Sequence, residues 1–403
     1  MKTITVRNLL MTLVALVLSL YAVAEDNIKG SAPADNQRYG LYNVESGQFV
    51  GFSGGSLSLS TGRGSLVTLT SADPNNVNTG SYELTFGQDA VWTTFQGTVG
   101  VGDVPANGNK TWMFNLVDAA ENIYTMGCRD NDANAVDYLY YSTMNSGFAL
   151  SYEEPTLGGR WKLVAEDDLP WLLVLDEGSS NNVIPTDTDP YLVHLKRTFT
   201  LNSWNTLCLP FSLTTAQLKN QFGEDVQLVA PGGFIEGTKT LSFYNALKEK
   251  DAETSVEAGY TYLVKPTMEP QNSYYSFENI SGFVDQPTDQ TIAGGVKFTG
   301  SFNKTVAPIG KYIIRKNTVY CLTKDMAMKG FRAWFAPVSE SQAPIYFWAI
   351  DEDDPTGIEE VFKRKGAVDI YSIGGTLVRQ GATSTQGLLK GVYIVDGQKV
   401  LVK

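Results

Sequence analysis

The sequence predicts an all-β protein built from several domains. Runs of roughly four to eight residues alternate between apolar and polar side chains, and Gly, Asn, Ser and Pro separate these runs. Apolar faces with the 3.6-residue period of helices are scarce. One helix is expected within 213–223, where Thr214 and Gln217 have the spacing of a capping box and Gly223 is placed as a left-handed stop.

Polar segments without periodicity mark the expected domain boundaries in a chain of 403 residues. The first β region is interpreted as a β-trefoil, with a simple sandwich as the competing architecture. The expected parts are a signal peptide (1–24), a disordered segment (25–37), a trefoil-like domain (38–176), a linker (177–190), a β-sandwich with one short helix (191–350), a second linker (351–360) and a small C-terminal sandwich or hairpin domain (361–403).

A faint internal repeat favours the trefoil. The stretches TWMFNLVDAAENIYTMG and RWKLVAEDDLPWLLVLD each have a Trp ahead of an apolar pair, then an acidic turn, then another apolar strand. Their first Trp residues, Trp112 and Trp161, lie about 50 residues apart. A period of roughly 40–50 residues suits a fold in which each third contributes four short strands.

The N-terminus has the three parts of a secretory signal peptide. Lys2 and Arg7 precede an apolar run over 9–20, and Ala22 and Ala24 form a small-residue cleavage site. The run is short for a membrane anchor, which needs about 20 apolar residues. We therefore expect cleavage after Ala24, export, and no transmembrane segment in the mature chain.

Charge and residue counts disfavour several classes of function. The net charge of −12 repels phosphate backbones, so nucleic acid is not an expected partner. The single histidine, His194, lies in an alternating strand, which indicates a structural role and rules out a site with two histidine ligands. Three widely spaced cysteines, Cys128, Cys208 and Cys321, predict buried thiols rather than a disulfide framework.

One acidic segment has the ligand types of a calcium loop. CRDNDANAVD (128–137) places oxygen-bearing side chains at alternate positions. Ala135 and Tyr141 stand where an EF-hand has Gly and Glu, so a polar turn is the favoured interpretation and weak Ca²⁺ binding the alternative. No other cofactor is indicated. The candidate ligands are Asp130, Asp132, Asn134 and Asp137.

Aromatic residues make up 11% of the chain, and some of them are candidate stacking platforms for sugars. Alternating aromatics in strands also fill cores or pair across strands, and the Q-x-W signature of ricin-type lectins is absent. These aromatic residues are therefore interpreted either as core side chains or as platforms on which sugars stack. The candidate sugar-binding residues are Trp92, Trp112, Tyr138 and Tyr140.

The chain ends in two strand pairs, VDIYSIGGTLVR (368–379) and LLKGVYIVDGQKVLVK (388–403). Asp-Gly between two β runs predicts a type I′ hairpin turn. Together the pairs resemble the C-terminal sorting domain of type IX secretion cargo in the Bacteroidetes, except that Thr376 stands where this family often has Arg. The expected sorting signal comprises Tyr371, Gly375, Gly391, Tyr393, Asp396 and Gly397.

This resemblance implies passage across the outer membrane, and a merely stabilising C-terminal domain is the alternative. WNTLCLPFSLT (204–214) and MKGFRAWF (328–335), with EAGYTYLVKP (257–266) between them, are similar to a β domain of large secreted proteins in the same phylum. YGLYNVESGQFVG (39–51) and GRWKLVAEDDL (159–169) loosely resemble a trefoil-like module found upstream of it. These motifs indicate lineage and export, and they name no reaction.

We therefore expect a secreted or outer-membrane surface protein with a non-enzymatic, adhesion-type binding role. Its expected partners are the secretion machinery, through the C-terminal domain, and a glycan or surface protein. A lectin-like carbohydrate-binding protein is the alternative. A carbohydrate-active enzyme comes third, because the sequence has no HExxH or Walker motif and a Ser-His-Asp mechanism would have to use the single histidine, His194.

Overall fold

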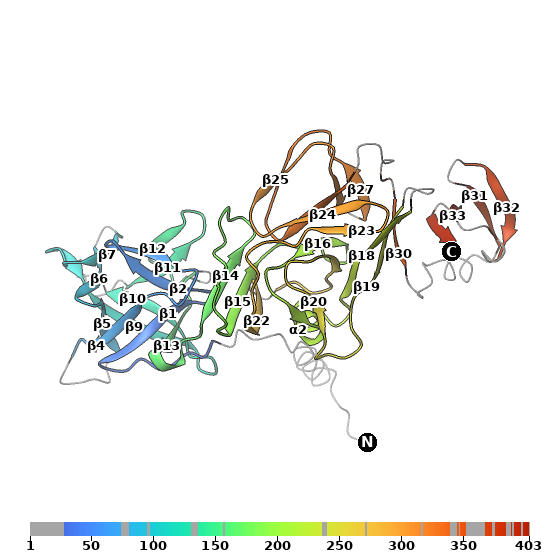
Figure 1. The fold of residues 1–403 in the computed structure, drawn as a ribbon. Coiled ribbons are helices and arrows are strands. Elements are labelled where there is room, and N and C mark those ends of the chain that lie inside the picture. Colours follow the sequence, from blue (N-terminus) through green and yellow to red (C-terminus); the bar gives the residue numbers. More distant parts are fainter. Residues whose placement is uncertain are drawn as a thin grey trace, which may run out of the picture. The chain divides into compact units, whose positions relative to one another are not determined.

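The computed structural model describes residues 28–402 except for 74–79, 95–96, 130–135, 156–157, 236–239, 271, 316, 339–344, 346, 352–366, 373–374, 384–387, 389–390 and 396–397. The described residues confirm the all-β class (Figure 1). By its internal contacts the chain forms two compact units. The first comprises residues up to 175 together with 189–196 and 270–280, and the second comprises 176–188, 197–269 and 281 onward.

Six strands of the first unit form a closed ring. Each strand is antiparallel to its two neighbours, and the order β1–β4–β5–β9–β10–β13 returns to β1. Closure leaves this ring without a free edge. Its strands are β1 (Gln37–Asn43), β4 (Leu66–Ser71), β5 (Ser81–Phe86), β9 (Thr111–Asp118), β10 (Ile123–Arg129) and β13 (Trp161–Ala165).

Three hairpins connect the ring strands, one in each third of the sequence. They pair β2 (Gln48–Ser53) with β3 (Ser56–Leu59), β6 (Asp89–Thr94) with β7 (Val99–Gly102), and β11 (Val136–Ser142) with β12 (Gly147–Ser151). A short strand, β8 (Gly108–Asn109), also pairs with β6. Four strands per third around a six-stranded ring make this a β-trefoil, so the competing simple sandwich is wrong for this region.

The two tryptophans of the internal repeat occupy matching places in the trefoil. Trp112 on β9 donates its indole N–H to the carbonyl of Val91 on β6, at 2.9 Å. Trp161 on β13 donates to the carbonyl of Leu139 on β11, at 3.1 Å. Both tryptophans are fully buried. In two of the three repeats of the trefoil, an equivalent hydrogen bond from a Trp indole N–H thus links the fourth strand to the second.

A three-stranded sheet belongs to the first unit although two of its strands lie later in the sequence. It orders β14 (Leu172–Asp176), β15 (Tyr191–Lys196) and β22 (Tyr275–Ile280). His194 on β15 is fully buried, donates from Nδ1 to the carbonyl of Gly47 at 2.7 Å, and stacks on Tyr274 with ring centroids 4.1 Å apart. These packing contacts agree with the structural role expected for this histidine.

The second unit contains the expected β-sandwich. One sheet orders β16 (Asn205–Cys208), β21 (Thr261–Lys265), β18 (Gln227–Ile235), β19 (Thr240–Asn245) and β30 (Phe347–Asp351). The other orders β23 (Gln290–Ile292), β24 (Val296–Ser301), β29 (Arg332–Pro337), β26 (Tyr312–Arg315) and β27 (Thr318–Cys321). Side chains of both sheets share one core, in which Phe243 meets Phe298 edge to face at 6.0 Å.

Two minor strand pairs and the helix complete this unit. β17 (Leu213–Thr214) pairs with β20 (Thr254–Val256), and β25 (Thr305–Ala307) pairs with β28 (Met326–Met328). Helix α2 (Thr215–Phe222) begins at the predicted capping box of Thr214 and Gln217. Gly223 ends it with a positive φ of 101°, but its ψ of 150° lies outside the left-handed helical region, so the predicted type of stop is wrong.

The segment expected to be a linker at 177–190 begins with buried, bonded side chains. Asn182 donates to the backbone carbonyls of Asp176 and Phe302, at 3.0 and 2.9 Å. Glu177 is only 4% exposed. A polar composition alone does not show that a segment is solvated, because side-chain amides and carboxylates also satisfy buried backbone groups and charges.

Glu177 is the centre of a charged cluster in the second unit. Its carboxylate accepts hydrogen bonds from Lys329 and Thr198, each at 2.7 Å, and from Arg332 at 2.6 Å. Burial raises the pKa of Glu177, but the bonds from Lys329 and Thr198 and the charges of Arg332 and Lys329 outweigh it and hold that pKa below its ordinary value. The cations of KGFRAWF thus serve a structural ion pair.

The C-terminal residues form a separate antiparallel sheet with a very small core. Its order is β32 (Leu377–Ala382), β31 (Val368–Ser372), β33 (Gly391–Val395) and β34 (Gln398–Val402). Val395 pairs with Gln398, which confirms the terminal hairpin; Asp396 and Gly397, between them, lie outside the described residues. Ile370, Ala382 and Val395 are its buried centre. Gly375 has a φ of 82°, a conformation that favours glycine.

Among the described residues, no helix is long and apolar enough to cross a membrane. The expected cleavage residues Ala22 and Ala24 lie outside the described part of the chain, as does most of the second expected linker.

Replacing the buried carboxylate tests the Glu177 cluster. We expect Glu177→Gln to lower the free energy of unfolding of the second unit by about 2 kcal/mol, because two charge-assisted hydrogen bonds are weakened. Urea unfolding at pH 7 measures this. Since the pKa of Glu177 is lowered on folding, the advantage of the wild type is full above about pH 4.5 and shrinks as the pH falls through the folded pKa. A difference between wild type and variant that grows on acidification contradicts this account.

Candidate functional site

Two tyrosines point outward from one strand of the trefoil. Tyr138 and Tyr140 lie two residues apart on β11, so they share one face of the strand. Both are partly exposed, while Asp137 and Leu139, which alternate with them, are buried. The strand thus presents core side chains inward and two aromatic rings outward.

Small residues flank these rings on the neighbouring strands. Gly127 of β10 is directly opposite Tyr138, and Ser151 of β12 is opposite it on the other side. Ala149 is opposite Tyr140. A Cβ added at Gly127 would lie 3.7 Å from the Tyr138 ring and 2.5 Å from Val136, so only glycine fits this place without displacement. Each tyrosine is therefore larger than the residues paired with it on the neighbouring strands.

Polar side chains follow on the same side of the sheet. Thr125 lies two residues before Gly127 on β10, and its hydroxyl donates to the Glu154 carboxylate at 3.1 Å. Asn115 of β9 is paired with Thr125 and is exposed, as is Glu154. We call Tyr138, Tyr140, Asn115, Thr125 and Glu154 the outer tyrosine face. It combines aromatic rings with amide, hydroxyl and carboxylate groups, which is a set of groups suited to polyhydroxylated ligands.

The pseudo-symmetry of the trefoil relates Trp92 to Tyr140. Val91 and Leu139 each accept an indole N–H, so the residues that follow them occupy matching positions on β6 and β11. Trp92 is partly buried, and its ring lies over Gly100 of β7, where an added Cβ would come within 2.3 Å. Its Nε1 is buried and has no acceptor among the described residues. The Trp92 ring is thus less available for stacking with a ligand than the rings of Tyr138 and Tyr140.

The prediction that Trp112 binds sugar is wrong. This side chain is fully buried in the trefoil core, and its indole N–H donates a hydrogen bond to the carbonyl of Val91. An alternating pattern shows which residues share a face, but it does not show which face is inward.

Trp171 is an exposed aromatic residue that the sequence analysis did not single out. It is 46% exposed. The guanidinium of Arg63 lies 4.8 Å from the centroid of its ring, and Arg63 also donates to the carbonyl of Leu169 at 3.0 Å. Pro170, directly before it in the break between β13 and β14, is the sequence signal for its exposure.

The calcium candidates do not come together in the described residues. Asp130, Asp132 and Asn134 lie outside them. Asp137 is described, and it is 5% exposed on the inner side of β11. Within the described ranges, no group of three His, Cys, Asp or Glu side chains is placed to hold a metal ion.

The cysteines divide into two environments. Cys128 and Cys208 are buried, and burial raises the pKa of the Cys208 thiol to about 12. Cys321 is exposed, so the prediction of a buried thiol is wrong there. All three are free thiols.

No protein-family model matches the chain, and no curated protein matches it. Several solved structures resemble part of it, and the following two are among them. The structure of SeviL bound to the asialo-GM1 saccharide is 15% identical, covers 32% of this chain and 98% of its own, and has a TM-score of 0.26. An apo crystal form of the BEL β-trefoil is 16% identical, covers 34% and 97%, and has a TM-score of 0.27. At these scores the trefoil assignment depends on the strand order of this chain itself.

Adding one methyl group tests the position of Trp92. We expect Gly100→Ala to push the indole off β7 and to lower the free energy of unfolding of the trefoil by about 1–3 kcal/mol. Gly147→Ala in β12 is the matched control, because an added Cβ there meets nothing closer than 3.8 Å. Urea unfolding measures both. Equal stability of the two variants would show that Trp92 does not lie on Gly100.

Proposed function

We propose that this protein is a non-enzymatic binding protein of the cell surface or extracellular space, and that its trefoil binds a glycan through the outer tyrosine face. The observation that carries the proposal is the arrangement of Tyr138 and Tyr140 as neighbouring, partly exposed rings on β11, beside the Thr125–Glu154 hydrogen bond. The lectin-like alternative of the sequence analysis thereby becomes the specific form of the binding role.

The chemistry of a sugar suits this face. The C–H side of a pyranose ring is apolar and packs on aromatic rings, while its hydroxyls need donors and acceptors once they leave water. Glu154 and Asn115 are both exposed next to the buried Thr125, so they supply an acceptor and an amide for such hydroxyls. Because the backbone of β10, β11 and β12 is fixed by ladder pairing, Tyr138, Tyr140 and Thr125 need little ordering on binding.

The proposed localisation depends on the two ends of the chain. The N-terminus has the composition of a secretory signal, and the C-terminal sheet has the hairpin expected of a sorting domain. Tyr371 in β31 is 37% exposed, and Gly375 has a positive φ in the turn that follows. We propose that this sheet is recognised as a folded unit by a secretion machinery.

Glycan binding is tested with the mature chain on a glycan array. We expect selective retention of a glycan by the wild type, and a loss of affinity of about tenfold or more in Tyr138→Ala/Tyr140→Ala, because two stacking surfaces are removed. Tyr138→Phe/Tyr140→Phe should retain most of the affinity, since the rings remain. Tyr244→Ala, at a 50% exposed tyrosine of the second unit, controls for loss of any exposed ring. Retention of no glycan, or equal binding by all variants, contradicts the proposal.

Export is tested by removing the terminal sheet. In its own host, the full chain should reach the cell surface or medium, whereas a chain truncated after Glu360 should stay in the periplasm. Cell fractionation and intact mass measure the location and any loss of the tail. If both chains distribute alike and the tail stays on, the sheet is an ordinary domain and the sorting proposal fails.

A further inference from the structure

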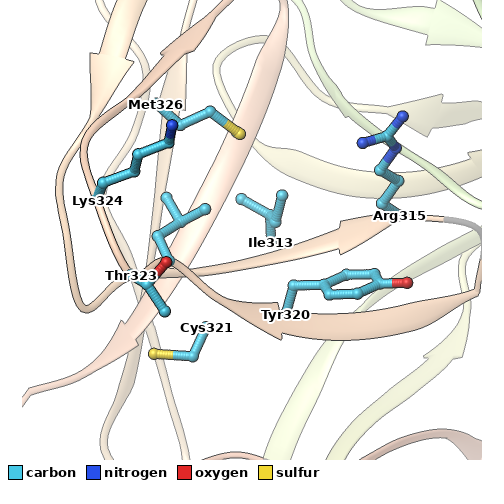
Figure 2. Close-up of a pocket in the computed structure, with 8 residues that line it drawn as sticks. Ile313, Arg315, Tyr320, Cys321, Thr323, Lys324 and Met326 are labelled. Carbon is cyan, nitrogen blue, oxygen red and sulfur yellow. The ribbon is translucent and has the colours of Figure 1, made fainter.

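The second unit has a pocket of about 410 Å³ on its β26–β27 hairpin (Figure 2). This volume lies within the range of small-molecule sites, roughly 300–1,000 Å³. Alternation along β26 creates the pocket. Tyr312 and Ile314 point into the sandwich core, while Ile313 and Arg315 point away from it and line the pocket. The sandwich core therefore supports the wall of the pocket from behind.

Backbone hydrogen bonds hold the walls in place. Ile313 pairs with Tyr320 across the hairpin. The N–H of Leu322 donates to the carbonyl of Lys311, and the N–H of Gly310 donates to the carbonyl of Leu322, both at 2.8 Å. The chain then continues into β28, where Met326 pairs with Ala307. A fixed pocket of this kind requires little rearrangement to accept a ligand.

The lining is cationic although the whole chain carries a net charge of −12. Arg315 and Lys324 stand on either side of Ile313, and the Tyr320 ring lies along the same opening (Figure 2). No carboxylate lines the pocket, and neither cation forms an ion pair with any residue that the structure describes. Asp325, adjacent to Lys324 in sequence, accepts the backbone N–H of Ile309 at 2.8 Å and is not part of the lining.

We propose that this pocket binds a small organic anion with an apolar body, such as an aryl or alkyl carboxylate or sulfonate. Ile313, Leu322 and Met326 offer apolar surface for the body, and the Tyr320 ring offers a face for stacking. The guanidinium of Arg315 presents paired donors to an oxyanion, and Lys324 adds a second charge. This site lies wholly in the second unit and is independent of the proposed glycan face.

The thiol of Cys321 does not face the pocket, although Cys321 contributes to its wall. Cys321 pairs with Tyr312 across the hairpin, and paired residues of two antiparallel strands share one face. The thiol therefore lies on the face of β27 opposite the Tyr320 ring, and Figure 2 shows its sulfur pointing away from Ile313. Occupancy of the pocket is therefore followed with a probe that becomes fluorescent when it leaves water.

The probe is 8-anilinonaphthalene-1-sulfonate, and its uncharged counterpart is N-phenyl-1-naphthylamine. Fluorescence titration measures the affinity of both probes. We expect the wild type to bind the sulfonate about tenfold more tightly than the uncharged amine. Arg315→Gln and Lys324→Gln should each weaken binding of the sulfonate about tenfold and leave binding of the amine unchanged, because each removes a charge-assisted contact. Lys250→Gln, at a surface lysine with an 82% exposed side chain, should leave binding of the sulfonate unchanged.

Unfolding midpoints of all variants should match that of the wild type, since Arg315 and Lys324 are exposed. Equal affinity for both probes would overturn the proposal, because charge then plays no part. Binding of the sulfonate that is unchanged in Arg315→Gln and Lys324→Gln would also overturn it, because the probe then binds elsewhere. Equal weakening in Lys250→Gln would show only a general attraction between charges, and would overturn it as well.

Discussion

The closed ring of six strands is the constraint on which the proposed glycan site depends. Ring closure fixes, for each of its six strands, which side chains face the core and which face outward. Trp112 and Trp161 complete the constraint from inside, because each is buried and each gives its N–H to a carbonyl of a neighbouring hairpin. With Leu139 held in this way, its neighbours Tyr138 and Tyr140 face outward.

Alternation about a fixed core also explains the pocket of the second unit. Tyr312 and Ile314 are held in the core between the two sheets of the sandwich, so Ile313 and Arg315 must lie on the opposite face. In both units, well-packed inward residues thus leave outward residues of the same strand available for ligands. The cationic lining of this pocket stands in contrast to the net charge of −12 of the whole chain.

Much of the fold was predictable from local patterns. The all-β class, the central sandwich, the capping box at Thr214 and the terminal hairpin follow from periodicity and turn chemistry. The Trp repeat correctly pointed to the trefoil, because the repeated residues hold repeated positions. Assignment of β15 and β22 to the first unit was not predictable, since it depends on contacts between residues far apart in sequence.

The candidate site was predictable only in part. Tyr138 and Tyr140 lie on an outer face, whereas Trp112 is core, and no local pattern separates these cases. Glu177 and Asn182 belong to a segment that reads as a linker, but their partners Lys329 and Phe302 lie more than 100 residues away. Trp171 was missed because it directly precedes an apolar strand.

The most direct test of the glycan-binding face is hydroxyl-radical footprinting of the mature chain, with and without the glycan best retained on the array, read by mass spectrometry. The account predicts that saturation protects Tyr138 and Tyr140 from oxidation, while Tyr152 and Tyr244, which are 75% and 50% exposed, react as before. Protection confined to Trp171, or to residues of the second unit, would contradict the outer tyrosine face as the binding site.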